Sequence, residues 1–166
     1  MMTTRRTLLR TLPAVALLTV APMASALGPP TGRVILTIES KPGERKFDFD
    51  MAMLEKLPQR TFATHTPWYP AARTFTGPLL RDVLAAAGVS GTQLRLIALN
   101  DFKVGMPVSD TKRFDVIVAR LLDGQPMAVR DKGPLFVIYP YDSSTELQSE
   151  LYFGRSAWQL RTIEVQ

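Results

Sequence analysis

The stretch TFATHTPWYPAARTFTGPLLRDVLAAAG, residues Thr61–Gly88, contains the local patterns that decide the fold. Its first residues predict a short β-strand. Pro67 and Pro70 then fix their own φ angles and push the residues before them toward extended conformations. We therefore expect Trp68 and Tyr69 to lie on a rigid aromatic loop of the kind that lines a pocket.

The second half of the same stretch predicts a helix that packs on a core. Pro78 is suited to the first helical position, and Gly88 is suited to the position just after the last turn. An apolar stripe runs between them at helical spacing. Its members are Leu79, Leu80, Val83, Leu84 and Ala87.

On either side of this stretch, short apolar and β-branched runs separated by turn residues predict mostly strands. The expected strands cover residues 34–39, 47–49, 93–99, 102–108, 114–122, 125–129, 135–139 and 159–165. Asp50 is expected to cap a short helix at 51–57, and Asp123-Gly124 is typical of a β-hairpin turn. The pattern predicts an α+β domain, mostly β with a few short helices.

Two polar patterns outside the strands predict local features. Ser143 and Glu146 have capping-box spacing and favour a short helix after them. Asp110, Lys112 and Arg113 form a charged cluster that we interpret as a solvated loop. Neither pattern by itself indicates a site.

The first 26 residues have the layout of an export signal. Residues 4–10 contain paired arginines, residues 12–23 are mostly apolar, and Ala24-Ser25-Ala26 forms a small-residue cleavage site. The arginine pair followed by two leucines is typical of a twin-arginine signal. An ordinary secretory signal and an uncleaved anchor are the alternatives, although the apolar run is short for a membrane span.

Composition favours one exported domain without disulfides. The full chain has 20 Lys and Arg against 15 Asp and Glu, and 17 against 15 remain once residues 1–26 are removed. No basic run remains, so we expect no nucleic-acid partner. We expect residues 27–33 to be a flexible lead-in and 34–166 to form one domain in the periplasm. Because the chain has no cysteine, its stability must come from its core.

Five motifs, in this order, carry a family resemblance: FTGPLLRDVLAAAG, ALNDF, DVIVARLLDGQPM, GPLFVIYP and RSAWQLRTIEV. Together they resemble the molybdopterin-binding domain of the sulfite oxidase family over nearly all of the chain after residue 26. The resemblance implies that fold, and it implies a pocket for a pterin or molybdopterin-like ligand.

The chain also departs from that family. Its enzymes bind molybdenum through a cysteine thiolate that would fall in residues 64–66, and this chain has no cysteine. Phe136 stands where the enzymes often have an arginine, and Ala157 stands where they usually have a lysine, with Arg155 two residues earlier. The chain is similar to a small exported branch whose members resemble pterin-binding sensors that work with a membrane-bound signalling enzyme.

A pterin site needs a planar partner for the ring and a carboxylate or amide for its amino and amide edge. Trp68 and Tyr69 are candidates for stacking, and Arg73 offers a cationic plane. Asn100 and Asp101, at a strand end, are candidates for reading the edge. The alternatives are that Trp68 is a core anchor and that Asn100 and Asp101 only make a turn.

Arg155 and Ser156 take the place of the family's cofactor-contacting segment. Arg155 is a candidate for binding a phosphate or a ring carbonyl, and a solvated surface arginine is the alternative. His65, the only histidine, stands where the metal thiolate would be. A lone imidazole is a poor metal site, so we interpret His65 as a pocket-lining hydrogen-bonding group or an exposed residue, with no metal and no catalytic residue assigned.

Three functions follow as hypotheses. The first is an exported, non-catalytic protein that binds a small heteroaromatic ligand of the pterin class and signals its occupancy to a membrane-bound partner. The second is a molybdopterin-dependent oxidoreductase whose metal is held without a protein thiolate. The third is an interaction module that has kept the fold and lost the ligand.

Overall fold

The computed structural model describes residues 27–40 and 45–166. The export signal expected at 1–26 and the turn expected at 41–44 lie outside these residues. The strands are β1 (Leu36–Ser40), β2 (Arg45–Phe49), β3 (Gln59–Thr66), β4 (Tyr69–Pro78), β5 (Gln93–Ala98), β6 (Lys103–Pro107), β7 (Ile117–Ala119), β8 (Leu121–Leu122), β9 (Gln125–Pro126), β10 (Phe136–Ile138), β11 (Ala157–Trp158) and β12 (Leu160–Val165). The α-helices are α2 (Met51–Lys56), α3 (Leu80–Ala86), α4 (Val108–Arg113) and α5 (Glu150–Phe153).

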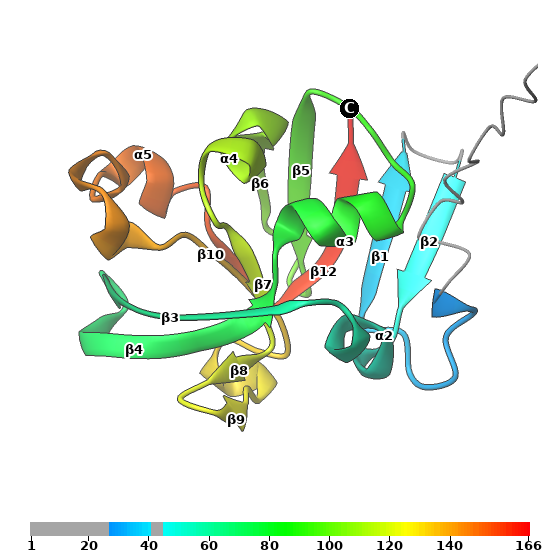
Figure 1. Ribbon diagram of the computed structural model, residues 1–166, viewed down its shortest axis with the longest axis horizontal. Coiled ribbons are helices and arrows are strands. Elements are labelled where there is room, and N and C mark those ends of the chain that lie inside the picture. Colours follow the sequence, from blue (N-terminus) through cyan, green and yellow to red (C-terminus); the bar gives the residue numbers. More distant parts are fainter. Residues whose placement is uncertain (1–26, 41–44) are drawn as a thin grey trace, which may run out of the picture.

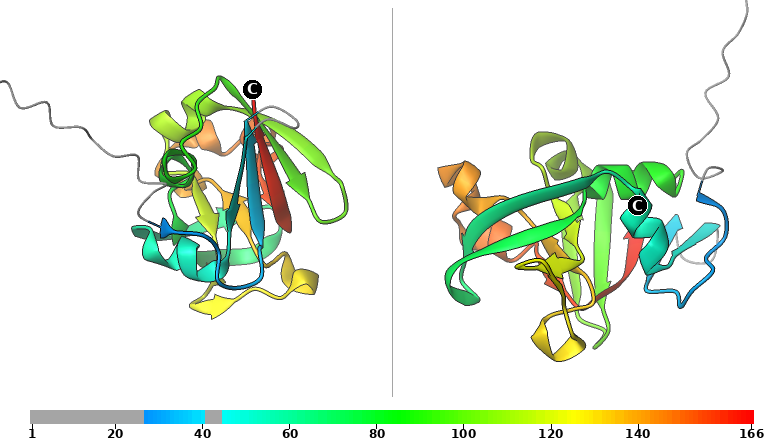
Figure 2. Two further views of the ribbon diagram at one scale, coloured as in Figure 1. Left: turned by 90° about the vertical axis from the view of Figure 1, so that its right-hand side faces the viewer. Right: turned by 60° about the horizontal axis from the view of Figure 1, so that its bottom comes forward.

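These strands form three sheets (Figure 1). The largest has the order β2-β1-β12-β5-β6, in which β1 and β12 run parallel and the other neighbours are antiparallel. A second sheet is β11-β10-β7, and a third is β3-β4-β8-β9. Figure 2 shows β8 and β9 beside β4, where they extend the third sheet. The chain thus forms the α+β domain, richer in strands than in helices, that its sequence predicts.

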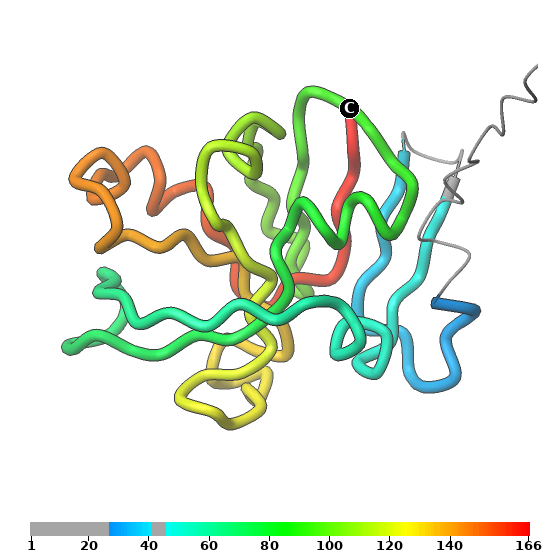
Figure 3. Tube along the Cα trace, in the orientation of Figure 1, coloured from blue at the N-terminus to red at the C-terminus, as the bar shows by residue number. Residues whose placement is uncertain are grey.

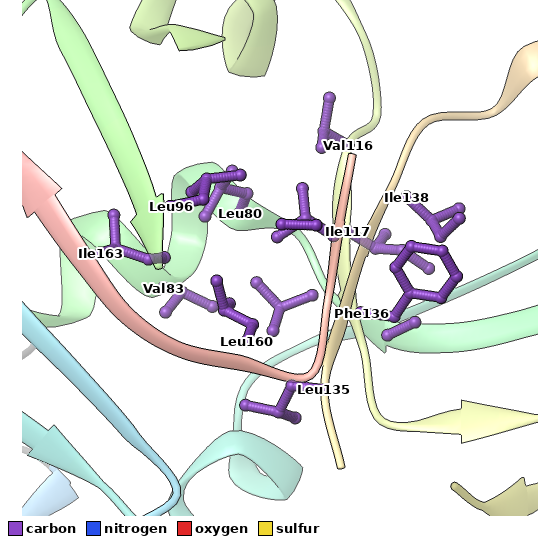
Figure 4. Close-up of a cluster of buried hydrophobic side chains, with 14 of the residues drawn as sticks. Leu80, Val83, Leu96, Val116, Ile117, Leu135, Phe136, Ile138, Leu160 and Ile163 are labelled. Atoms are coloured by element: carbon purple, nitrogen blue, oxygen red, sulfur yellow. The ribbon is translucent and has the colours of Figure 1, made fainter. Parts of the chain in front are cut away.

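Helix α3 covers the five-stranded sheet, and one part of the core lies between them. Leu80 and Val83 are fully buried, and Figure 4 shows them facing Leu96, Leu160 and Ile163 of the sheet. The apolar stripe that the sequence predicts for this helix is therefore confirmed. The helix itself begins two residues later than expected.

Pro78 does not open α3, because it is the last residue of β4. Leu79 keeps an extended conformation, with φ −62° and ψ 136°, and forms a β-bridge with Ile117. Gly77 just before it lies so close to β7 that a Cβ there would be 2.0 Å from the Val118 carbonyl oxygen. Because Leu79 pairs with β7, the helix begins only at Leu80, and the sequence prediction of its start was wrong.

The expected aromatic loop is instead a long β-hairpin. Strands β3 and β4 are joined by a turn of only two residues, Pro67 and Trp68, so Tyr69 and Arg73 belong to a strand. A register shift between Thr64 and Thr66 interrupts the ladder next to Pro70, which is the kind of place where a sheet tolerates proline. Figure 3 shows the hairpin reaching out toward the segment around residues 140–155.

The charged cluster expected as a solvated loop is helix α4. Asp110 is 1% exposed, and its carboxylate accepts hydrogen bonds from the Tyr139 hydroxyl at 2.7 Å and from Arg155 Nη1 at 2.8 Å. Lys112 and Arg113 are exposed, as predicted. The prediction for Asp110 was wrong because its two partners come from segments 29 and 45 residues away.

The caps follow the expected residue types, although not always at the expected position. Asp50 caps α2 by accepting a hydrogen bond from the Met53 amide, as predicted. The capping residue near 145 is Ser144, whose hydroxyl accepts from the Glu146 amide, and not Ser143. It opens a short 3₁₀ turn, Thr145–Leu147, and α5 follows separately.

The hairpin at Asp123-Gly124 is confirmed, and its return strand is shorter than expected. Strand β9 covers only Gln125–Pro126, and a 3₁₀ turn at Val129–Asp131 replaces the rest of the predicted strand. No helix within the described residues is long and apolar enough to cross a membrane.

Candidate functional site

A cleft of about 500 Å³ lies beside the turn of the long hairpin. We call it the Trp68 cleft. Its walls are the start of β4, the β8–β9 turn and the segment that follows β9 as far as Lys132. Three of the predicted site residues line it: Trp68, Tyr69 and Arg73.

Trp68 is half-buried and supported by other rings. Its ring centroid lies 5.4 Å from that of Phe136 and 5.6 Å from that of Trp158, in tilted and edge-on arrangements. The indole is therefore both a core contact and a wall of the cleft, and its role in stacking on a ligand stays a prediction.

Tyr69 and Arg73 form the polar and cationic part of the same wall. The Arg73 guanidinium lies 5.1 Å from the Tyr69 ring centroid, and its Nε donates to Asp123 Oδ2 at 2.6 Å. Burial raises the pKa of the Tyr69 hydroxyl, against the opposing effect of Arg73. The amide of Thr74 and then the Arg73 side chain lower the pKa of Asp123. At neutral pH this wall carries a neutral phenol and a paired guanidinium.

The opposite wall is the segment from Met127 to Lys132, which the fold holds tightly. The Gly133 amide donates to the Ala128 carbonyl at 2.9 Å, and a Cβ at Gly133 would lie 2.0 Å from the Met127 carbonyl oxygen. Lys132 has a positive φ of 71° and accepts a hydrogen bond from the Gln159 amide. These contacts fix Lys132 at the edge of the cleft.

The structure does not bring the predicted edge-reading pair into this cleft. The Asn100 side chain accepts a hydrogen bond from the Phe102 amide, which is ordinary turn chemistry. Asp101, in the left-handed region at φ 64°, pairs with Arg161 and has a side chain 76% exposed. The carboxylates that do line the cleft are Asp123 and Asp131.

Arg155 and Ser156 also lie outside the Trp68 cleft. Arg155 pairs with the buried Asp110 and lies over the Tyr152 ring at 5.1 Å. Ser156 is buried and hydrogen-bonded to the Tyr141 hydroxyl, and it lines a separate aromatic groove with Trp68 and Trp158. Both residues are engaged in packing around the site.

His65 lies on β3 with a side chain 72% exposed. Its backbone amide and its Nδ1 both lie 2.9 Å from Asp142 Oδ2. The Asp142 amide in turn donates to Thr64 Oγ1 at 3.0 Å. These contacts attach the hairpin to the 3₁₀ turn Tyr141–Ser143, beside a smaller hollow.

The sequence did not predict nine of the twelve residues that line the cleft, and the charged ones among them are Asp123, Arg130, Asp131 and Lys132. The Asp123-Gly124 pair predicted a hairpin. It did not indicate that this hairpin would lie beside Tyr69. Lys132 carried no signal of its own. The closeness of this segment to β4 follows from the pairing of β4 with β8, in which Phe75 lies opposite Leu122.

Molybdenum does not fit the residues of this chain in the way that the family resemblance implies. The chain has no cysteine thiolate. Within the described residues, no three or more histidine, aspartate or glutamate side chains gather as a metal-binding group. His65, where the thiolate would stand, has only Asp142 beside it.

Comparison with known proteins supports the fold. No family model matches the chain, and no curated protein matches it. Among solved structures it is similar to the crystal structure of the sulfane dehydrogenase SoxCD from Paracoccus pantotrophus, with a TM-score of 0.59 and 17% identity. The match covers 78% of this chain and 37% of the length of that one. The chain therefore has an α+β, sulfite oxidase-like domain.

Proposed function

We propose that the protein is an exported, non-catalytic protein that binds a pterin-class ligand in the Trp68 cleft and reports its occupancy to a membrane-bound partner. The observation that carries this proposal is the composition of the cleft. Two aromatic side chains and a paired arginine form one wall of a space of about 500 Å³. A cleft of this size with an aromatic wall suits a small heteroaromatic ligand, and its charged residues offer polar contacts to the edge of such a ligand.

Each wall supplies a different part of the recognition. Trp68 and Tyr69 offer ring faces or edges to a planar heterocycle, and the Arg73 guanidinium adds a cationic plane beside Tyr69. The oxygens of Asp123 already accept from Arg73 and from the Thr74 amide. Asp131 is the more exposed carboxylate of the cleft, so we assign the reading of the amino edge to Asp131.

The absence of cysteine favours binding over catalysis. A pterin held here keeps its ring contacts without any metal ligand from the protein, and the carboxylates of the cleft serve it as hydrogen-bond acceptors. The exposed His65 lines a different hollow from the one that Trp68, Tyr69 and Arg73 line. The binding experiment below also tests the two other hypotheses, a molybdopterin-dependent oxidoreductase and an interaction module without a ligand.

The test is a fluorescence titration of the full chain with hydroxymethylpterin, joined to metal analysis and native mass spectrometry of protein isolated from a periplasm. The chain has two tryptophans, with ring centroids 5.6 Å apart, so a ligand in the cleft is expected to quench both. We expect a bound pterin without molybdenum. Stoichiometric molybdenum would indicate the enzyme, and neither binding nor a thermal shift would indicate the interaction module.

Two substitutions locate the site. Trp68→Ala is expected to abolish pterin binding while thermal unfolding stays cooperative. Arg73→Ala is expected to weaken binding about tenfold, because it removes one charged contact. Arg95→Ala is the matched control, since Arg95 also pairs with a carboxylate on an exposed strand face, away from the cleft. Unchanged affinity in the Trp68 and Arg73 variants would contradict the assignment.

A further inference from the structure

Four cations within the described residues lie over aromatic rings, and they do not have the same partners. Three are arginines, and each also forms an ion pair with a carboxylate. The pairs are Arg73–Asp123, Arg113–Glu146 and Arg155–Asp110. The fourth is Lys132, for which the structure shows aromatic neighbours and no acidic partner in the described part of the chain.

Lys132 lines the cleft opposite the aromatic wall, and its ammonium group lies near Tyr69 of that wall and near Trp158 beside the cleft. Its Nζ lies 5.1 Å from the Trp158 ring centroid and 5.9 Å from that of Tyr69, and the residue is half-buried. Of the charged residues that line the cleft, Arg73 is paired with Asp123 and Arg130 with Asp131. Lys132 leaves the cleft with one uncompensated positive charge.

The backbone at Lys132 is strained, and the surrounding fold maintains the strain. A non-glycine residue with φ of 71° is uncommon. Gln159, itself at φ 53°, donates its amide to the Lys132 carbonyl and its Nε2 to the Val129 carbonyl at 2.7 Å. Asparagine or glycine would occupy this position at lower cost. Strain that the fold preserves around one side chain often marks a functional position.

Ligand binding changes the surroundings of this ammonium group. A planar ligand that fills the cleft removes water from Lys132, and a neutral ligand would leave the charge without compensation. An anionic group on the ligand supplies the missing partner through a charge-assisted hydrogen bond. The cleft therefore favours a ligand that is both planar and negatively charged at one end.

We propose that Lys132 is the anion subsite of the Trp68 cleft, and that the ligand carries a phosphate or carboxylate on the side chain of its pterin. This inference rests on the proposed function, and it narrows the ligand to an anionic member of the class. Arg155 does not serve this subsite, because Asp110 already compensates its charge.

The test compares three probes in the same titration: hydroxymethylpterin, its monophosphate and carboxypterin. We expect wild-type protein to bind at least one anionic probe about tenfold more tightly than the neutral one, as one charged hydrogen bond would give. Whether the monophosphate or carboxypterin is preferred identifies the anion. The preference should weaken as salt is added, because the contact lies at the edge of the cleft.

Lys132→Met removes the charge and keeps the length of the side chain. We expect it to erase the preference for the anionic probe while the affinity for hydroxymethylpterin stays within about twofold of wild type. Lys103→Met, on the exposed strand β6, is the matched control and should keep the preference. Equal binding of all three probes by wild-type protein would refute the anion subsite and leave the pterin site in place. Binding of none would refute the proposed function itself.

Discussion

Arg155 and Lys132 are both cations placed 5.1 Å from the centre of an aromatic ring, but they differ in their second partner. Arg155 donates to the carboxylate of Asp110, whose side chain is 2% exposed. Lys132 has no carboxylate partner within the described residues, and it lines the Trp68 cleft. The charge of Arg155 is compensated inside the fold, whereas the ammonium group of Lys132 can still pair with an anionic group of a ligand.

The comparison separates residues that hold the structure from residues that are available for recognition. A buried carboxylate that accepts from two donors is costly to lose, because both donors are left without their partner. A half-buried ammonium over an aromatic ring keeps contact with water, so its removal costs little. Substitutions at the Asp110 pair should therefore change stability, and substitutions at Lys132 should change binding.

The largest expected effect is that of Asp110→Ala. It leaves the Tyr139 hydroxyl and the Arg155 guanidinium without their common acceptor, and we expect the free energy of unfolding to fall by about 3 kcal/mol. Urea denaturation followed by far-ultraviolet circular dichroism measures the loss. Asp82→Ala, in the first turn of α3 and only half-buried, is the control and should cost less than about 1 kcal/mol. Equal losses in the two variants would mean that Asp110 is not the key acceptor.

Arg155→Met is expected to cost less, about 2 kcal/mol, because the Tyr139 hydroxyl still donates to Asp110 and the methionine stem still packs on Tyr152. The affinity for all three pterin probes should remain within about twofold of wild type. This variant also tests the sequence interpretation of Arg155 as a phosphate-binding residue. A selective loss of affinity for the phosphorylated probe would restore that interpretation and move the anion subsite away from Lys132.

Asp50 is a third kind of charge, compensated by backbone amides instead of a cation. The amides of Gly32, Met53 and Thr31 donate to its carboxylate at 2.8 Å, and those of Gly32 and Met53 are the main causes that lower its pKa. Because the folded-state pKa is below the unfolded value of about 3.9, this stabilisation is fully present above that pH. It is lost as the pH falls through the folded-state pKa.

The measurement is the urea midpoint of wild type and Asp50→Asn between neutral pH and strongly acidic pH. Asparagine can still cap α2 but cannot accept all of the amide hydrogen bonds, so wild type should be more stable at neutral pH. We expect the difference to stay constant down to about pH 4 and then to narrow. A difference that persists unchanged below that range would show that the charge of Asp50 contributes nothing.

Much of the fold could be predicted from the sequence, because its signals are local. The Asp50 cap, the Asp123-Gly124 hairpin and the stripe on α3 depend on residues a few positions apart, and all three are confirmed. Helix α4 was missed because its apolar face is weak and Asp110 is satisfied only by Tyr139 and Arg155. The start of α3 was wrong because the bridge between Leu79 and Ile117 is a tertiary contact.

Only one wall of the candidate site could be predicted, namely the wall whose residues are close together in the sequence. Trp68, Tyr69 and Arg73 stand within six residues of one another, and the structure keeps them along one wall. The opposite wall comes from a segment about 60 residues later, so nothing local indicated that Asp131 or Lys132 would face them. A sequence motif can suggest a ring-stacking residue such as Trp68. The proposed role of Lys132 depends on its having no carboxylate partner within the described residues, which only the folded structure shows.

The smallest expected change in stability, and the sharpest form of the comparison, is Lys132→Gly. Glycine adopts a φ of 71° without steric cost, which offsets the lost contact with Trp158 and the greater entropy of the unfolded chain. We expect the free energy of unfolding to change by less than about 1 kcal/mol, while the preference for the anionic probe disappears as it does in Lys132→Met. A loss of stability near that of Arg155→Met would mean that Lys132 holds the structure as Arg155 does, and the distinction between the two cations would fail.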